Sequence, residues 1–190
     1  MAIKIPIEVS ARHIHLSQGD LEALFGSGYK LKKLRQLTQQ SDFAAEEFID
    51  IKNGENIIRN VRVVGPLRLQ TQVEITLTDA YNLGINPPIR NSGDLQNSTG
   101  VTLVGPHGEL ELKRGVIISS RHLHCSPQEA RQLNLKDTMM ISVKTEGKRA
   151  IVFRNIKVRV GLDYKLSLQL DTDEGNAAWI NKTGEGYLID

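Results

Sequence analysis

Two short histidine motifs are the residues of this chain best suited to chemistry. His13 and His15 form one His-x-His motif, His122 and His124 form the other, and together they account for four of the chain's 5 histidines. Side chains two residues apart on a β-strand point to the same side, about 6.5–7 Å apart, so each pair of imidazoles can converge on one metal ion. Tetrahedral zinc needs more than two ligands, so others must come from elsewhere in the fold.

Both motifs belong to an internal duplication. Segments 9–17 and 118–126 share the frame apolar, Ser, small, Arg, His, apolar, His, x, Ser. Each segment ends at a serine that is followed three residues later by an acid, and this pattern predicts a capped helix start after each motif. Further along the chain, segments 59–63 and 73–77 match segments 154–158 and 168–172. The sequence therefore predicts two halves that are built alike.

The predicted fold is mainly β with short helices, arranged as two small β-barrel domains. β-Branched residues with period-2 character predict strands, and Gly, Pro and Asn residues separate these strands. The predicted strands span residues 57–64, 71–78, 139–144, 150–160 and 165–170. We expect one short helix in each half. The predicted domains are residues 1–90 and 91–190, joined in the Pro-, Gly- and Asn-rich segment 86–100.

The duplication also indicates where more metal ligands come from. Glu74 lies between apolar residues in a predicted strand, so its carboxylate either faces solvent or binds metal. Its counterpart in the second half is Gln169, again between two leucines. A glutamine carbonyl can coordinate zinc, but it is neutral and a poorer donor than histidine or carboxylate. We therefore expect Glu74 to be a ligand and Gln169 to be its weakened counterpart.

Three arginines and the two helix starts favour an anion beside the metal. Helix N-termini carry partial positive charge and free N–H groups. Arg12, Arg68 and Arg121 can add bidentate contacts to phosphate, although Arg12 and Arg121 are equally suited to structural ion pairs. Cys125, which follows His124, is expected to point away from the histidines, so it is predicted to be neither a ligand nor a nucleophile.

Composition narrows the class of protein. The formal net charge is +2, with both signs interspersed and no dense basic stripe, which disfavours nucleic-acid binding. The single cysteine excludes an internal disulfide framework, and no apolar run is long enough for a membrane span. No secretory signal precedes the first motif, so we expect a cytoplasmic protein without membrane partners. The sequence leaves open whether the protein forms a homo-oligomer.

The chain resembles the phosphate propanoyltransferase family, the PduL-type phosphotransacylases, over almost its whole length. The motifs that carry the resemblance are long and specific. They comprise segments 10–17, 37–39, 43–47, 65–66, 71–75, 78–80, 83–85, 87–90, 92–95, 121–124 and 171–177, together with Arg68.

This resemblance implies two β-barrels and a two-zinc site between them. It implies reversible transfer of propanoyl or acetyl groups between coenzyme A and inorganic phosphate, with a place in 1,2-propanediol degradation. By motif match, the expected metal ligands are His13, His15, Glu74, His122 and His124. The expected phosphate contacts are Ser10, Gln39 and Arg68, and Arg68 is also the expected catalytic residue.

Gln169 departs from the family pattern, which has a histidine at this position. The resemblance implies two zinc ions per chain, and the departure at Gln169 predicts that one of them is bound less tightly. It leaves two alternatives open: a degenerate metal-binding or regulatory β-barrel protein, and a metal-dependent acyl-CoA hydrolase. Family members in bacterial microcompartments often carry an N-terminal targeting extension, whereas here the first motif opens at Ser10, so we expect a free cytoplasmic enzyme.

Overall fold

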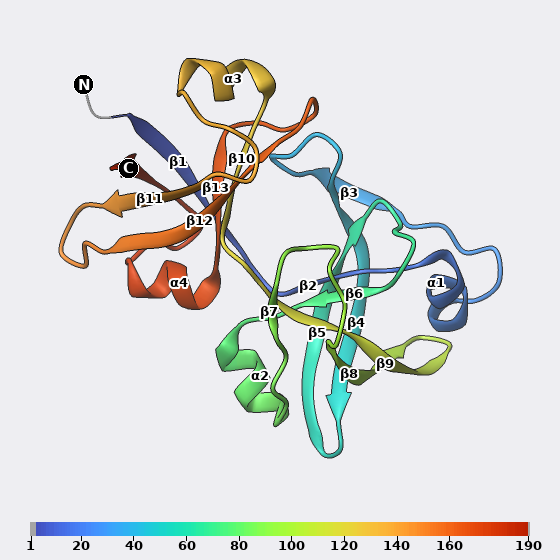
Figure 1. Ribbon diagram of the computed structural model, residues 1–190. Coiled ribbons are helices and arrows are strands. Elements are labelled where there is room, and N and C mark those ends of the chain that lie inside the picture. The colour runs from blue at the N-terminus through green and yellow to red at the C-terminus, as the bar shows by residue number, and fades with distance from the viewer. Residues whose placement is uncertain (1–2, 190) are drawn as a thin grey trace. The chain divides into compact units, whose positions relative to one another are not determined.

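The computed structural model describes residues 3–189 and divides the chain into two compact units. The first unit is Arg12–Ser119, and the second unit consists of the described residues up to Ala11 together with those from Ser120 onward. Each unit contains a closed barrel of six strands, so the predicted fold of two small β-barrels is confirmed (Figure 1). Among residues 3–189, no helix has the length and apolar character that crossing a membrane requires.

The barrel of the first unit closes through six strands in the order β4, β5, β2, β6, β9 and β8. Short strands β3 and β7 extend it beside β4 and β9. The strands are β2 (His13–His15), β3 (Lys33–Gln36), β4 (Phe43–Asn53), β5 (Asn56–Gly65), β6 (Gln72–Glu74), β7 (Ile89–Arg90), β8 (Thr99–Gly105) and β9 (Gly108–Ser119), and the helices are α1 (Gln18–Phe25) and α2 (Leu77–Leu83).

The second unit repeats this plan with the strand order β1, β13, β10, β12, β11 and β14. Parallel and antiparallel pairings also correspond: β10 runs parallel to β12 and antiparallel to β13, as β2 does to β5 and β6. The elements are β1 (Lys4–Ser10), β10 (His122–Cys125), α3 (Pro127–Gln132), β11 (Met140–Thr145), β12 (Val152–Val160), β13 (Ser167–Asp171), α4 (Thr172–Ala177) and β14 (Thr183–Leu188).

Strand pairing divides the chain differently from the contiguous halves predicted at 1–90 and 91–190, whose end residues 1–2 and 190 lie outside the described part. β1 precedes the first histidine motif but pairs with β13 and β14 of the second unit. β9 precedes the second motif but pairs with β6 and β8 of the first unit. The chain therefore passes between units at residues 11–12 and 119–120, and segment 86–100 lies within the first unit.

Each unit has two helices, so the prediction of one helix per half is wrong. The missed helices, α2 and α4, begin at the capping boxes of Thr76 with Asp79 and of Asp171 with Glu174. In each box the N-cap side chain accepts from the backbone N–H of the acid, and the acid accepts from the N-cap N–H. The strand predicted for residues 71–78 ends at Glu74 because this cap turns the chain. The Ser17 and Ser126 caps of α1 and α3 are confirmed.

The middle residue of each histidine motif anchors its strand in a core. Ile14 lies opposite Val63 on one side and Val73 on the other, and all three are 0% exposed. Leu123 lies in the same way between two buried neighbours, Val158 and Leu168. Because side chains alternate along a strand, these apolar rows direct the flanking histidines to the opposite face of the sheet.

We expect Leu123→Ala to lower the free energy of unfolding by about 2–5 kcal/mol, because it removes a fully buried side chain from the core of the second unit. Urea denaturation followed by circular dichroism measures this loss. The matched control is Leu162→Ala in the same unit, where the side chain is 88% exposed and the change should cost about 0.5 kcal/mol or less. Equal losses in both variants would contradict the assignment of Leu123 as a core anchor.

Candidate functional site

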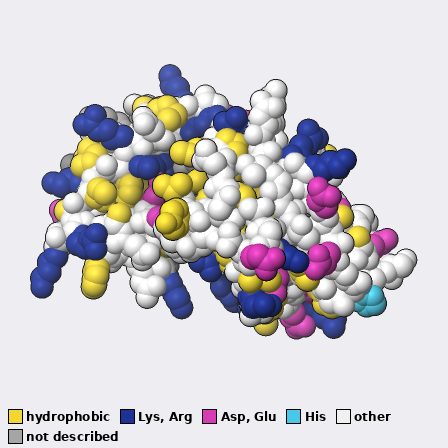
Figure 2. Space-filling model, turned by 90° about the horizontal axis from the view of Figure 1, so that it is seen from below, with side chains coloured by type: hydrophobic (Ala, Val, Ile, Leu, Met, Phe, Trp, Pro, Cys, Tyr) yellow, Lys and Arg dark blue, Asp and Glu magenta, His cyan; other side chains and the backbone are white. Residues whose placement is uncertain are grey.

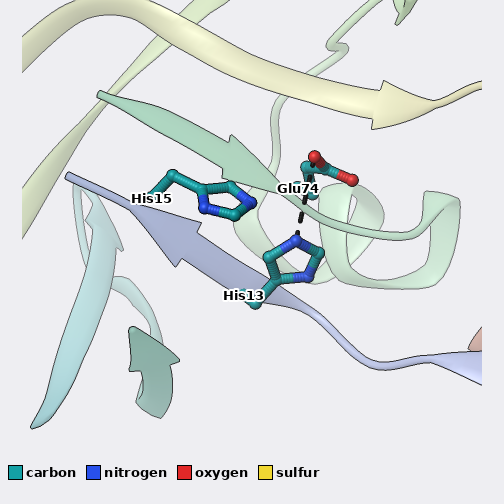
Figure 3. Close-up of side chains that lie close together, drawn as sticks. All are labelled: His13, His15 and Glu74. Atoms are coloured by element: carbon teal, nitrogen blue, oxygen red, sulfur yellow. Dashed lines mark ion pairs between the residues drawn. The ribbon is translucent and has the colours of Figure 1, made fainter. Parts of the chain in front are cut away.

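His13 and His15 of β2 and Glu74 of β6 form a compact cluster (Figure 3). Strands β2 and β6 are antiparallel, and their register places Glu74 directly opposite His13. The His13 Nε2 atom lies 3.8 Å from Glu74 Oε1, and one ligand atom from each of the three residues lies within 4.8 Å of the others. Two imidazoles and one carboxylate are a ligand set that zinc takes in proteins, so these residues fit the metal.

A hydrogen bond to the backbone determines which ring nitrogen of His15 carries the proton. Its Nδ1 lies 2.9 Å from the backbone carbonyl oxygen of Val64. A carbonyl only accepts hydrogen bonds, so Nδ1 carries the proton in the neutral ring and Nε2 keeps the lone pair. A backbone carbonyl that holds the second ring nitrogen is the usual way in which a metal-binding histidine is oriented.

Electrostatics place the cluster in the protonation states that bind metal. Burial alone would raise the pKa of Glu74, but His13, His15, the Ser92 hydroxyl and the Arg68 guanidinium together lower it to about 2. Burial is the main cause that holds the pKa of His15 well below its usual 6.5, with His13 and Arg68 adding to the effect. At neutral pH, Glu74 is therefore an anion and His15 is neutral.

A second layer of polar residues holds Glu74 in place. The Ser92 hydroxyl donates to Glu74 Oε1 over 2.9 Å and accepts from Arg68 Nη1 over 3.0 Å. Gln72 Nε2 donates to Ser92 Oγ over 2.9 Å and to Glu74 Oε1 over 2.5 Å. Sequence reasoning missed the positions of Ser92 and Gln72 in the site. The spacing of two residues from Glu74 is a signal that could have placed Gln72 on the same face.

The second histidine pair lies at the corresponding place in the second unit. The rings of His122 and His124 have centroids 4.5 Å apart, compared with 5.0 Å for His13 and His15. The His122 Nδ1 atom lies 2.8 Å from the carbonyl oxygen of Ser120, which leaves Nε2 of the neutral ring with the lone pair. Gln169 lies directly opposite His122, as Glu74 lies opposite His13. Among residues 3–189, no third His, Cys, Asp or Glu joins this pair at the spacing of the first cluster.

Two of the arginines considered for phosphate make ion pairs within their own units. Arg12 contacts Asp79 through Nη2 at 2.7 Å and through Nε at 2.9 Å. Arg121 Nε lies 2.7 Å from Glu174. Both acids are the capping-box acids of helices α2 and α4. The contacts of both arginines therefore favour structural ion pairs over phosphate binding.

The remaining predicted residues are spread over both units. Arg68 lies beside the first cluster, where its charge acts on both His15 and Glu74. Gln39 is buried in the turn between β3 and β4 of the first unit. Ser10 ends strand β1 in the second unit, opposite Asp171. Joint phosphate binding by these three residues stays a prediction.

Cys125 points away from the histidines, as predicted. Its side chain is 0% exposed and packs in the core of the second unit. Burial, together with the nearby Glu129 and Asp137 carboxylates, raises the pKa of its thiol to about 11. A thiol in this state is a poor nucleophile at neutral pH.

Comparison with known proteins agrees with this geometry. A family model described as phosphate propanoyltransferase matches residues 6–181. The chain belongs to the phosphate propanoyltransferase family. Membership makes it an enzyme of the acyltransferase class, and it confirms the resemblance found in the motifs.

Individual relatives extend the match over nearly the whole chain. The phosphate propanoyltransferase of Thermotoga maritima is 44% identical over 187 residues, which cover 98% of this chain and 89% of the relative. The Alkaliphilus metalliredigens protein of the same name is 43% identical over 98% of this chain and 88% of its own length. That of Salmonella typhimurium is 45% identical over 92% of this chain and 83% of its own length.

We expect the Cys125 thiol to react with Ellman's reagent about 100-fold more slowly in the folded protein than in urea, because it is buried and protonated. Cys125→Ala should keep acyltransferase activity within about 3-fold and lose about 1–2 kcal/mol of stability. Loss of turnover in a variant that still folds, or an acyl group trapped on Cys125, would contradict this assignment.

Proposed function

We propose that this protein transfers a propanoyl or acetyl group reversibly between coenzyme A and inorganic phosphate, with zinc at its histidine motifs. The observation that carries the proposal is the His13, His15 and Glu74 cluster, linked through Ser92 to Arg68. This cluster lies in a chain that matches the phosphate propanoyltransferase family over residues 6–181. The second zinc is assigned to His122, His124 and Gln169.

The donor set of the first cluster suits a catalytic metal. Three protein ligands leave a fourth position for substrate, which distinguishes catalytic from structural zinc sites. When bound, zinc supplies Lewis-acid chemistry that polarises a substrate oxygen and offsets negative charge. Val64 and Ser92 support this role because they hold His15 and Glu74 in the orientations and charge states that binding requires.

Arg68 is the residue assigned to phosphate. Its Nη1 atom is anchored on Ser92, so the planar guanidinium is held beside the cluster. A guanidinium in this setting contacts two oxygens of phosphate at once. We assign Ser10 and Gln39 as further phosphate contacts on the family resemblance. The role of Arg68 is to hold a phosphate oxygen toward the thioester carbonyl carbon.

The proposed chemistry is direct transfer. A phosphate oxygen forms a bond to the carbonyl carbon, the carbon–sulfur bond breaks, and the thiolate of coenzyme A leaves with the electron pair. Burial of Cys125 supports a route without an acyl-cysteine intermediate, because a fully buried thiol cannot meet a thioester in solution.

Surface charge is consistent with small-molecule substrates. On the face that Figure 2 shows, the Lys and Arg side chains stand apart, with hydrophobic and acidic side chains between some of them. The phosphate backbone of a nucleic acid is usually met by a continuous basic stripe. The cytoplasmic location stays a prediction.

Release of coenzyme A from propanoyl-CoA and acetyl-CoA should depend on added phosphate, and acyl-phosphate should form in equal amount. Arg68→Ala should lower kcat/KM for phosphate by about 100-fold, because it removes the charged group assigned to hold this substrate. A thiol-reactive dye measures release, and hydroxylamine trapping measures acyl-phosphate.

Arg114→Ala is the matched control, because Arg114 is an exposed arginine of the same unit, and it should retain wild-type kinetics. Free acid in place of acyl-phosphate would show a hydrolase instead. No turnover of either donor by metal-loaded protein would favour a binding or regulatory protein.

Glu74→Gln should lower the zinc content of the purified protein by about one ion per chain, because it replaces the anionic ligand by a neutral one. Elemental analysis after dialysis against a weak chelator gives the count. Glu46→Gln makes the same charge change at an exposed position of β4 and should leave the count unchanged. An unchanged count in Glu74→Gln would contradict the assignment of this ligand.

A further inference from the structure

The two histidine sites each have one carboxylate in the same row of the sheet, but on different strands. In the first unit the row across β2, β6 and β9 reads His13, Glu74, Ile117. In the second unit the matching row across β10, β13 and β1 reads His122, Gln169, Glu8. The second site therefore keeps a negative charge, displaced by one strand from the position of Glu74.

Hydrogen bonds join the displaced carboxylate to Gln169. The Gln169 Nε2 atom donates to Glu8 Oε2 over 2.9 Å and to Ser167 Oγ over 2.8 Å. An ionised carboxylate only accepts hydrogen bonds, so the opposite orientation of the amide would place two acceptor oxygens against each other. Glu8 therefore determines which end of the amide is nitrogen, and both N–H groups of Gln169 are used.

We propose that Glu8 is a positioning residue of the second metal site, where it orients Gln169 so that the amide oxygen Oε1 serves as the third protein ligand beside His122 and His124. The inference rests on the metal chemistry of the proposed function and assigns a role to Glu8, which that function does not include. The carboxylate accepts one of the two amide N–H groups, which polarises the amide, increases the negative charge on Oε1 and makes it a better donor. Carboxylates that hold metal-binding histidines act in the same way.

In the second unit, Glu8 supplies the negative charge and Gln169 supplies the ligand atom, whereas in the first unit Glu74 supplies both. In the first unit, the place that corresponds to Glu8 is taken by Ile117, which is fully buried and apolar. There the ligand carries the charge itself. In the second unit the ligand is neutral and the charge lies next to it, which offsets part of the poorer donor strength of an amide.

Metal affinity tests the inference without reference to turnover. The two zinc affinities of each variant are measured by competition with a chromophoric chelator, and the ions are counted by elemental analysis. His122→Ala should remove the weaker ion and so assigns it to the second unit. Glu8→Gln should weaken the same ion by about 10- to 100-fold and leave the tighter one unchanged.

A double variant that exchanges the side chains of residues 8 and 169 is the more specific test. The double variant Glu8→Gln with Gln169→Glu returns the carboxylate to the strand position of Glu74, so it should bind the second ion at least as tightly as the wild type. Glu146→Gln is the matched control, because it removes one exposed carboxylate from the same unit and should change neither affinity. Circular dichroism of each variant shows that the fold is kept.

The outcomes separate the inference from the proposed function. Unchanged metal affinity in folded Glu8→Gln, or a wild-type chain that binds one ion, overturns the inference even if acyl transfer is active. Selective weakening in Glu8→Gln with recovery in the double variant supports the inference even if the wild type transfers no acyl group.

Discussion

A row of three apolar residues in each barrel holds the site in place. Ile14 between Val63 and Val73, and Leu123 between Val158 and Leu168, are all fully buried. Because these rows occupy the core, the histidines on either side of each middle residue must lie on the other face of the sheet. A slip of one residue would turn the imidazoles toward the aliphatic core and turn Ile14 or Leu123 out of it. The free energy of core packing thus enforces the register that brings His13, His15 and Glu74 together.

The same register brings Glu74 and Gln169 opposite a histidine, and the chain path crosses between the two units. β6 and β13 run antiparallel to the histidine strands, so Glu74 and Gln169 face His13 and His122 without any long side-chain reach. The strand that leads into each motif belongs to the other unit's barrel, since β1 pairs with β13 and β9 pairs with β6. The first barrel closes within the continuous segment Arg12–Ser119, whereas the second barrel needs β1 together with strands that follow Ser120.

The duplication preserves the arginine–acid ion pairs more strictly than the residues that lie opposite the histidines. Arg12 with Asp79 and Arg121 with Glu174 link each motif to the capping box of the second helix of its unit, α2 or α4. The residues opposite the histidines differ, because Glu74 is itself a carboxylate whereas Gln169 is hydrogen-bonded to a separate one, Glu8. The two histidine clusters are therefore chemically unequal within one architecture.

Much of this protein could be predicted from local pattern. The His-x-His spacing, the Ser17 and Ser126 caps, the duplication and the likeness to the phosphate propanoyltransferases depend on residues close in sequence, and alternation alone placed Cys125 away from the histidines. Helix α2 was missed because the β-branched run around Thr76 hid its capping box, and α4 was missed because Asp171 and Glu174 were not recognised as a helix start. The exchange of β1 and β9, the Ser92 network and the Glu8–Gln169 pair depended on the tertiary structure. These features join residues that only strand pairing brings together, and the register of distant strands follows from the packing of the whole core.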